Sequence, residues 1–385
     1  MRKYCDSLTA YARAATRPVA VGSVVIGGGN PVRIQSMTNT DTNDTEASAA
    51  QVRRIAGAGG EIVRLTAQGR REAANLAAIR ARLREEGCSV PLVADIHFDY
   101  RLAVESIRNG ADKVRINPGN IGGKENVRAV VRAAKERRIP IRIGVNSGSV
   151  EKDILSKYGG PCAEGLAESA LRNEAMVRNM GFDDIVLSLK SSDAAMNYQA
   201  HLLIADKTEC PLHIGVTESG TPSTGIIKSA AGLGALLLAG IGDTIRVSLT
   251  ADPVKEIPVA REILKSTGYF QGGIDFVSCP TCSRCRTDLT KIADEIMEQL
   301  GGIERKMLAK KMPPLKVAVM GCAVNGPGEA SDADFGIACG DGKGVYFRAG
   351  KVVRSVPEEE IANLMVAEIG KYVSEFSAGM ENNTI

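Results

Sequence analysis

The sequence predicts an α/β fold in which a closed (β/α)8 barrel of the TIM type is followed by a smaller α+β domain. From residue 31 to residue 268, the chain repeats one unit eight times: a β-branched run, a polar loop and an Ala-rich amphipathic helix. Alternating strands and helices form a parallel sheet, and eight units of about thirty residues close into a barrel. An open doubly wound sheet is the alternative arrangement of the same elements.

Each expected strand is short and rich in branched side chains. The eight are Val32–Met37, Ile62–Thr66, Leu92–Ile96, Lys113–Asn117, Ile141–Val145, Ile185–Leu189, Leu212–Thr217 and Thr244–Leu249. The helical patterns that follow them are Glu46–Ala58, Arg71–Glu86, Tyr100–Asn109, Glu125–Arg138, Glu164–Met180, Ala194–Lys207, Ser223–Ala239 and Val254–Ser266. A hairpin over Val19–Ile26, ahead of a run of three glycines, is expected to close the bottom of the barrel.

The repeat stops after Gly268, and Gly272-Gly273 predicts a linker. We therefore expect two domains, a barrel over residues 1–268 and a second domain over 269–385. The elements expected in the second domain are a helix (Leu289–Leu300), a strand (Leu315–Met320), a hairpin (Val345–Phe347 with Val352–Val356) and a final helix (Glu358–Ser374).

Composition excludes several classes of partner. The net charge is +3 without a block of like charges, aromatic residues make up 4% of the chain and Trp is absent. These features argue against nucleic acid and membrane surfaces as partners. Nine cysteines, several of them scattered, fit a reducing compartment better than a disulfide framework. The chain has neither a signal core nor a membrane-length apolar run, so we expect a cytoplasmic protein.

Four cysteines of the second domain predict an iron–sulfur cluster. Cys279, Cys282 and Cys285 follow one another at intervals of three residues beside Pro280, and Cys322 is the distant fourth thiol. Zinc would need a second Cys pair or a downstream His pair, whereas the three histidines, His97, His201 and His213, all lie upstream. A redox dithiol would use only the first two cysteines.

Polar residues at or near the carboxyl ends of the barrel strands predict an anion site. They are Arg64, Arg115, Asn117, Arg142, Asn146, Lys190, His213, Glu218, Arg246 and Ser248. Because gathered cations repel one another, they indicate a ligand with more than one phosphate charge, which arginine binds bidentately. A single strand-end Arg, by contrast, is usually a surface ion pair.

The loop after the seventh strand, Glu218–Gly225, leads directly into a helix whose N-terminus offers an anion seat. Glu218 is placed for acid–base chemistry. His213 and His97 are candidates to polarise a hydroxyl, although each is also explained as a structural residue.

Six segments of the chain resemble the 4-hydroxy-3-methylbut-2-enyl diphosphate synthase family. The most specific are residues 32–40, 115–120, 142–149, 213–220, 278–282 and 319–329. The resemblance covers essentially the whole chain. It implies the two-domain bacterial form, with a second domain similar to those of sulfite reductases, and a [4Fe-4S] cluster held by Cys279, Cys282, Cys322 and Glu329. Cys285 has no ligand role in the family pattern.

The implied reaction is the two-electron reductive ring opening of 2-C-methyl-D-erythritol 2,4-cyclodiphosphate, with loss of water. No dinucleotide fingerprint opens a strand–helix unit, so the electrons come from outside; the resemblance implies flavodoxin or ferredoxin. A zinc-stabilised phosphometabolite-binding scaffold and a siroheme-type reductase are the alternative functions. The eighth helix returns the chain to the barrel bottom, so we expect a homodimer in which each cluster domain caps the barrel of its partner.

Overall fold

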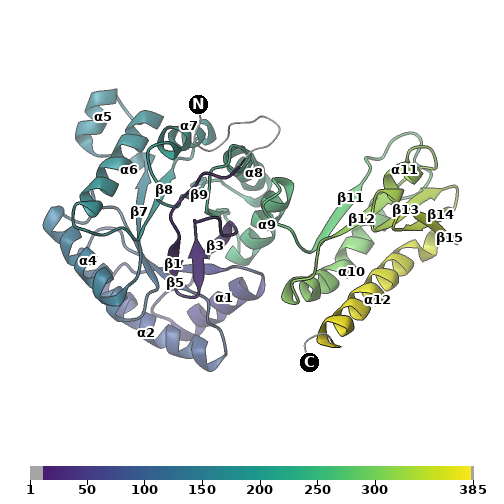
Figure 1. Cartoon of the computed structure of the whole chain (residues 1–385), viewed down its shortest axis with the longest axis horizontal. Coiled ribbons are helices and arrows are strands. Elements are labelled where there is room, and N and C mark those ends of the chain that lie inside the picture. Colours follow the sequence, from purple (N-terminus) through teal and green to yellow (C-terminus); the bar gives the residue numbers. More distant parts are fainter. Residues whose placement is uncertain (1–11, 383–385) are drawn as a thin grey trace. The chain divides into compact units, whose positions relative to one another are not determined.

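The computed structural model describes residues 12–382, and the side chains of residues 12–378. The chain divides into two compact units, Met1–Phe270 and Gln271–Ile385, which Figure 1 colours from purple to green and from green to yellow. Each unit has a hydrophobic core of its own and is described by itself.

Eight parallel strands form a barrel in the first unit. They are β3 (Arg33–Met37), β4 (Ile62–Thr66), β5 (Leu92–Asp95), β6 (Lys113–Ile116), β7 (Ile141–Asn146), β8 (Ile185–Lys190), β9 (His213–Gly215) and β10 (Thr244–Arg246). The sheet runs in chain order from β3 to β8, and β3 also pairs with β10, which pairs with β9. One parallel bridge between Leu187 and Leu212 joins the two ends of the sheet. The barrel prediction is therefore confirmed, and the open doubly wound sheet is excluded.

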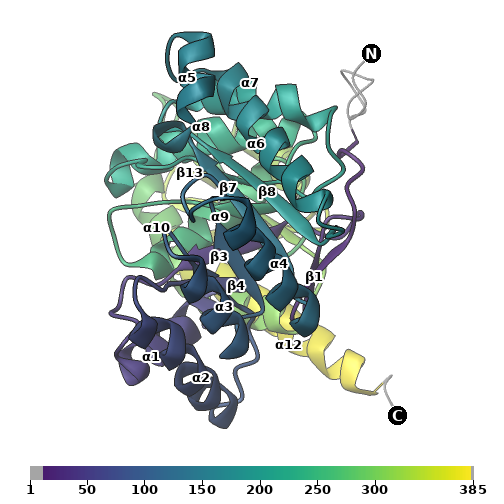
Figure 2. The ribbon, with the colours of Figure 1, turned by 90° about the vertical axis from the view of Figure 1, so that its left-hand side faces the viewer.

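Helices surround these strands in the view of Figure 2. They are α1 (Thr45–Gly57), α2 (Arg70–Glu85), α3 (Tyr100–Arg108), α4 (Lys124–Arg137), α6 (Ala163–Arg178), α7 (Ala194–Ala205), α8 (Pro222–Leu238) and α9 (Glu256–Ser266). Asp44, Asp99 and Asp193 accept hydrogen bonds from backbone N–H groups at the starts of α1, α3 and α7. These caps satisfy donors that a helix start leaves without partners.

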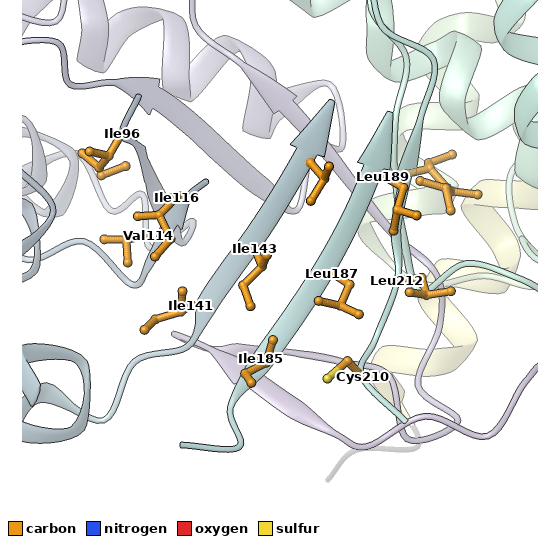
Figure 3. Packing of buried hydrophobic residues seen from close by; sticks show 14 of the residues in the cluster. Ile96, Val114, Ile116, Ile141, Ile143, Ile185, Leu187, Leu189, Cys210 and Leu212 are labelled. Carbon is orange, nitrogen blue, oxygen red and sulfur yellow. The ribbon is translucent and has the colours of Figure 1, made fainter. Parts of the chain in front are cut away.

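Side chains of each strand alternate between the helices and the barrel interior. Ile141 and Ile143 of β7, and Leu187 and Leu189 of β8, belong to the main hydrophobic core and lie in the same packed layer in Figure 3. The residues between them, such as Arg142, therefore face inward. This alternation places polar side chains inside the barrel without breaking the core outside it.

The N-terminal hairpin packs against the lower end of the barrel, as predicted. β1 (Val19–Val21) and β2 (Val24–Ile26) pair antiparallel. Val19, Val21 and Ile26 form a buried cluster with three residues near the amino ends of strands: Ile62, Val93 and Val186. The hairpin thus seals the barrel opposite its carboxyl-terminal rim.

Several details of the first unit differ from the prediction. The last two barrel strands end at Gly215 and Arg246, because the residues beyond them turn into loops over the rim. A short helix, α5 (Lys152–Tyr158), follows the 3₁₀ turn η1 (Ser147–Ser149) in a stretch for which the sequence predicts no helix or strand. A 3₁₀ turn, η2 (Pro253–Lys255), precedes α9, since Pro253 fits a helix start but lacks an N–H.

The second unit is a five-stranded mixed sheet. Its strands, in spatial order, are β11 (Ile274–Ser278), β12 (Leu315–Met320), β13 (Phe335–Gly340), β14 (Lys343–Arg348) and β15 (Lys351–Pro357). The first three are parallel and the last two form an antiparallel hairpin next to them.

Helices lie on both faces of this sheet. α10 (Leu289–Ala309) and α12 (Ile361–Asn382) pack on each other and share a buried cluster with β12, β13 and β14. α11 (Gly326–Ser331) packs on the opposite face through Ala330, beside Ala318 and Ala338. No helix of the described residues is long and apolar enough to cross a membrane.

The predicted elements of the second unit were incomplete. Ile274–Ser278, which directly follows the Gly272-Gly273 linker and was not among the predicted elements, is strand β11. β13 and α11 were not predicted, because glycines interrupt both patterns. α10 runs nine residues (309 − 300) past its expected end, and the last helix begins at Ile361 after the 3₁₀ turn η3 (Glu358–Glu360).

Candidate active site

Inward side chains of the barrel form levels stacked along its axis. Followed around the barrel, the strand registers return from Gln35 to the level of Gly27, the shear of eight residues (35 − 27) expected of a TIM-type barrel. Each level therefore takes its side chains from every second strand. We number the levels from the hairpin upward.

Apart from its apolar floor, the interior is unusually polar. Level 1 holds Ile62, Lys113, Val186 and Thr244; level 2 holds Gln35, Val93, Arg142 and His213; level 3 holds Arg64, Arg115, Ser188 and Arg246; level 4 holds Met37, Asp95, Gly144 and Gly215. Just past most strand ends, level 5 holds Thr66, Asn117, Lys190 and Ser248, and level 6 holds His97, Asn146 and Thr217. Barrels of this class usually fill such levels with branched apolar residues.

The arginines of level 3 share two carboxylates. Arg115 Nη1 lies 3.2 Å from Asp95 Oδ1, and Arg64 Nε lies 3.8 Å from Asp95 Oδ2. Arg246 Nη2 lies 3.4 Å from Oε1 of Glu256, which is buried at the start of α9. Two carboxylates do not neutralise the cations gathered here, since Arg142, Lys190 and Lys113 are also buried.

Burial and crowding shift the titration of these groups. The pKa of Arg64 is lowered to about 10: burial is the main cause and Asp95 opposes it, while Arg246 and Arg115 add to the lowering. Burial, with Arg64 and Arg142 close by, also holds the pKa of Lys190 well below its ordinary value. Burial alone would raise the pKa of Asp95, but the neighbouring arginines outweigh it and keep that carboxyl ionised. The buried cations of the barrel thus outnumber the carboxylates paired with them.

Two glycines of level 4 leave room among the cations. A methyl group at Gly144 would collide with the guanidinium of Arg115, and one at Gly215 would lie 2.8 Å from Nζ of Lys190 and 2.9 Å from the carbonyl oxygen of Arg246. Both positions therefore require a residue without a side chain. The glycines thus leave the space above level 3 open to the cationic side chains and to a ligand.

Two predicted rim residues are engaged in shaping the loops. Asn117 donates to Ser149 Oγ at 3.0 Å and accepts from the Gly119 N–H at 3.1 Å. Asn146 and Ser149 form a reciprocal capping box around the turn η1. Lys190 and Ser248 share their level with Asn117, so the structure brings these predicted residues together at the mouth of the barrel.

The two candidate histidines lie at opposite depths. His213 is the first residue of β9 and is fully buried in level 2, with Nδ1 2.7 Å from Thr244 Oγ1. It thus lies below the arginines rather than at the strand end where the sequence pattern placed it. Burial, with Arg142 and Lys190 nearby, holds its pKa well below the ordinary value, so the ring is neutral. His97 lies in the top level, 44% exposed, with Nε2 4.0 Å from Asp95 Oδ2.

Glu218 occupies a strained backbone position beside the start of α8. Its φ angle is +53°, in the left-handed region that residues other than glycine seldom adopt, and its side chain is exposed. Such strain concentrates at functional positions. Thr221, the residue before α8, does not cap the helix with its side chain. The first backbone N–H groups of this 17-residue helix can therefore donate to an acceptor other than the Thr221 hydroxyl.

In the second unit, two cysteines meet at one edge of the sheet. Cys279 follows β11 and Cys322 follows β12 by two residues, and the paired register of these parallel strands brings their carboxyl ends together. The Gly321 N–H donates to Cys279 Sγ at 3.2 Å. Backbone N–H groups of Asn325, Gly326 and Val324 lower the pKa of the Cys322 thiol, which favours its thiolate form.

The remaining candidates surround this edge. Cys282 is exposed in the loop after β11, whereas Cys285 is half-buried and donates its S–H to the Thr287 carbonyl oxygen at 3.3 Å. Glu329 lies exposed in the first turn of α11. Cys285 thus behaves as a local thiol that packs against the core, while Cys282 and Glu329 are open to a ligand.

The backbone around two of these cysteines suits thiolate ligands. Among the described residues, no group of three or more His, Cys, Asp or Glu side chains lies close enough to hold one metal ion. Cluster thiolates bind separate irons and stand farther apart than the ligands of one zinc ion. N–H groups directed at Cys279 and Cys322 suit sulfurs that carry negative charge.

Sequence reasoning missed Asp95, Glu256, Lys113 and Gln35. Asp95 and Lys113 lie within expected strands at inward-alternating positions, so strand alternation was the signal that could have found them. Gln35 is also inward on β3. Glu256 gave no local signal, because its ionic partner Arg246 lies on a different element.

Comparison with known proteins identifies the family. Residues 16–261 match the GcpE TIM-barrel domain, and residues 275–371 match the GcpE protein C-terminal domain. Three relatives are named 4-hydroxy-3-methylbut-2-en-1-yl diphosphate synthase (flavodoxin). They come from Anoxybacillus flavithermus (52% identity over 95% of this chain and 97% of the relative), Caldanaerobacter subterraneus (50%; 94% and 99%) and Bacillus subtilis (52%; 96% and 94%).

Among solved structures, N-acetylneuraminic acid synthetase from Leptospira borgpetersenii aligns with 66% of this chain and 90% of its own at 12% identity and a TM-score of 0.48, too low to bear on function. The family models cover most of the chain, and the named relatives are about half identical to it along nearly its full length. The chain therefore belongs to the GcpE family of 4-hydroxy-3-methylbut-2-en-1-yl diphosphate synthases.

Proposed function

We propose that this chain catalyses the reductive ring opening of 2-C-methyl-D-erythritol 2,4-cyclodiphosphate to 4-hydroxy-3-methylbut-2-enyl diphosphate in isoprenoid biosynthesis. The excess of buried cations beneath the barrel mouth carries this proposal. A substrate with two linked phosphates supplies the negative charge that Asp95 and Glu256 do not. Neither a phosphate-free substrate nor a purely structural role explains these cations.

The diphosphate binds above level 3 of the barrel. Arg64, Arg115 and Arg246 lie below it and Lys190 beside it, with Arg142 supporting them from level 2. The first backbone N–H groups of α8 add an uncharged binding site for an anion, since the Thr221 side chain does not cap them. Asn117, Asn146 and Ser248 at the mouth are placed to bind the hydroxyl groups of the carbon skeleton.

Cys279, Cys282, Cys322 and Glu329 hold a [4Fe-4S] cluster. When bound, the cluster supplies the electrons that cleave the carbon–oxygen bond. The donor is flavodoxin, the protein that the relatives carry in their name; ferredoxin is the alternative carrier. N–H groups around Cys322 stabilise its thiolate, and the exposed carboxylate of Glu329 is more readily displaced than a thiolate.

Glu218 holds the proton that leaves with the substrate oxygen as water. Its side chain is exposed near the start of α8, on a residue with a left-handed backbone conformation. Of the two histidines, His97 is placed to contact a ligand at the mouth, whereas His213 supports the site from two or more levels below it. We accordingly give His213, predicted as catalytic, a positioning role.

Each site is formed by two chains. Tyr269 N and Phe270 N both donate to the Leu264 carbonyl oxygen, which fixes the chain at the end of α9, at the barrel bottom. Only Gln271–Gly273 separate this point from β11, and three residues span about 10 Å. So short a tether favours a cluster domain that serves the barrel of a second copy in a closed homodimer.

An uncovered helix face supports the dimer. Beyond the first turn of α8, the exposed residues are apolar and recur at helical spacing: Ile226, Ile227, Ala230, Ala231, Ala235 and Leu238. Ile227 is 71% exposed and Leu238 is 53% exposed. A second copy that buries this α8 stripe removes apolar surface from water. The predicted cytoplasmic location belongs to the same proposal, supported by the free thiols of the described cysteines.

Anaerobic purification tests the proposal. The protein should contain iron and sulfide, absorb in the thiolate-to-iron charge-transfer region, and convert the cyclodiphosphate when reduced flavodoxin is supplied. A matched preparation of Cys322→Ser should lack both the absorbance and the turnover. An iron-loaded protein that leaves the cyclodiphosphate unchanged would overturn the proposal, as would a zinc-loaded colourless protein.

A further inference from the structure

The lower barrel contains a cluster of polar groups beneath the substrate site of the proposed function. Lys113 Nζ, both amide atoms of Gln35, Nε and Nη1 of Arg142, and Nε2 of His213 are buried without a hydrogen-bond partner. Their side chains are at most 1% exposed. Buried polar groups are nearly always satisfied, so unpartnered atoms of this kind call for an explanation, such as an ion or a water.

These groups come from four strands and meet on the barrel axis. Gln35, Arg142 and His213 share level 2, from β3, β7 and β9, and Lys113 lies one level lower, on β6. Within a level, side chains from alternate strands converge on the axis. Ile62 and Val186 share level 1 with Lys113, and Val93 shares level 2 with the other three groups. These three apolar side chains pack on the hairpin, and the arginine level lies above. The cluster is thus enclosed.

The cluster is positively charged and donor-rich. No carboxylate is among the charges that act on Lys113: its pKa lies well below the ordinary value because of burial, with Arg142 and Arg64 adding repulsion. His213 Nδ1 shares a hydrogen bond with Thr244 Oγ1 at 2.7 Å, and the other ring nitrogen, Nε2, is buried without a partner. Water satisfies donors and acceptors alike, whereas donors converging with cations favour an anion.

We propose that the lower barrel binds a small inorganic anion of halide size, held by Lys113, Arg142, His213 and Gln35. The anion site lies directly beneath the diphosphate site, and Arg142 borders both. The charge of Arg142 acts on Lys113 below and on Arg64 and Lys190 above. The bound anion would compensate the positive charges of Lys113 and Arg142. It would thereby stabilise the lower barrel beneath the arginines that face the substrate.

Bromide is the probe. Crystals of the full-length, cluster-loaded protein without substrate, grown in sodium bromide, should show an anomalous bromine peak between Lys113 and Arg142. In solution, sodium chloride should raise Tm above that in sodium gluconate of the same ionic strength, because gluconate is too large to enter. Lys113→Met and Gln35→Leu, of similar size to the native residues, should remove the chloride-specific part of the shift. Lys124→Met, which changes an exposed lysine after the same strand, should retain it.

Three results would overturn the inference: water in place of bromide between Lys113 and Arg142, bromide bound only at the mouth beside Lys190, or a Tm response that is identical for chloride and gluconate. The crystallographic result does not depend on any variant, so a poorly folded Lys113→Met protein would not leave the question undecided. Loss of turnover plays no part in either readout, which keeps this test separate from that of the proposed function.

Discussion

The backbone N–H of Gly321 donates a hydrogen bond to Sγ of Cys279 across 3.2 Å, from the end of one strand to the end of its neighbour. Forty-two residues separate the two in sequence, yet the parallel register of β11 and β12 places the residue before Cys322 against Cys279. The sheet itself therefore positions two of the four predicted cluster ligands.

The ligand set makes the first prediction. Cys279→Ser, Cys282→Ser and Cys322→Ser should each lose iron and charge-transfer absorbance, because each removes a thiolate. Cys285→Ser should retain both, since Cys285 donates its S–H to Thr287 and packs against the core. Iron content and the visible spectrum measure the outcome. A colourless Cys285→Ser protein that is folded by circular dichroism would show that the run of three cysteines is the ligand set and Glu329 a bystander.

Removal of the charge that compensates the level-3 arginines should destabilise the barrel. Asp95→Asn leaves Arg64 and Arg115 buried without their carboxylate, at a cost of about 3–5 kcal/mol in the free energy of unfolding. Urea denaturation measures this difference. An equally stable variant would mean that the arginines are already compensated by other groups.

The same carboxylate predicts an acid dependence. The neighbouring arginines lower the folded-state pKa of Asp95 below its ordinary value of about 3.9, so its stabilising contribution is present above that value and is lost as the pH falls below it. The stability difference between wild type and Asp95→Asn should therefore stay nearly constant from about pH 7 to about pH 5 and narrow progressively below about pH 4. A stability difference that does not change with pH down to about pH 2 would place the folded pKa near the unfolded one.

We expect substrate binding to need the space that the glycines of level 4 leave open. In Gly215→Ala the new methyl group meets Lys190 Nζ and the Arg246 backbone, so both cations shift and kcat/KM should fall by about 10–100-fold. Gly234→Ala is the matched control: its methyl group meets nothing within 4 Å in the middle of α8, and it should gain about 0.5–1 kcal/mol of stability. If Gly215→Ala turned over like wild type, the glycine would have no part in shaping the site.

Charge recognition gives a further test. Arg115→Ala removes a charge-assisted hydrogen bond to phosphate worth about 1.5–3 kcal/mol, and the rise in the Kd of the cyclodiphosphate measures it. Arg128→Ala, at an exposed surface pair with Glu125, should leave the Kd unchanged. Equal affinities for the two variants would return Arg115 to a structural ion pair with Asp95.

Complementation tests the two-chain site. A barrel-deficient double variant, Arg142→Ala with Glu218→Gln, is mixed with Cys322→Ser under subunit exchange. Mixed dimers then contain one site with both halves intact, so activity should return to about a quarter of wild type for random pairing. No single chain holds both working halves, so activity from a site within one chain cannot arise. Inactivity after verified exchange would place the site within each chain.

Local patterns predicted the barrel well and its interior poorly. The bounds expected for Ile62–Thr66 are those of β4, because a branched run between polar loops has few alternatives. By contrast, β13 was missed, since Gly336 and Gly340 weaken its pattern and only its neighbours β12 and β14 stabilise it. The periods of strands and helices can be recognised from neighbouring residues, whereas strand pairing depends on residues far apart in the sequence.

Prediction of the candidate site met the same limit. Alternation along a strand tells that Arg142 and His213 face inward, but their depth depends on the registers of all eight strands. Sequence reasoning therefore placed His213 at the mouth, whereas the shear of the barrel lowers it beneath the arginines. Asp95 was overlooked for a related reason: its significance comes from Arg64 and Arg115 on the two adjacent strands.

The hairpin beneath the barrel leaves the barrel interior accessible from one end. Val19, Val21 and Ile26 close the lower end, so we expect the substrate and the product of the proposed reaction to pass through the mouth at the opposite end. We also expect a molecule bound at that mouth to inhibit turnover without contacting the reacting atoms.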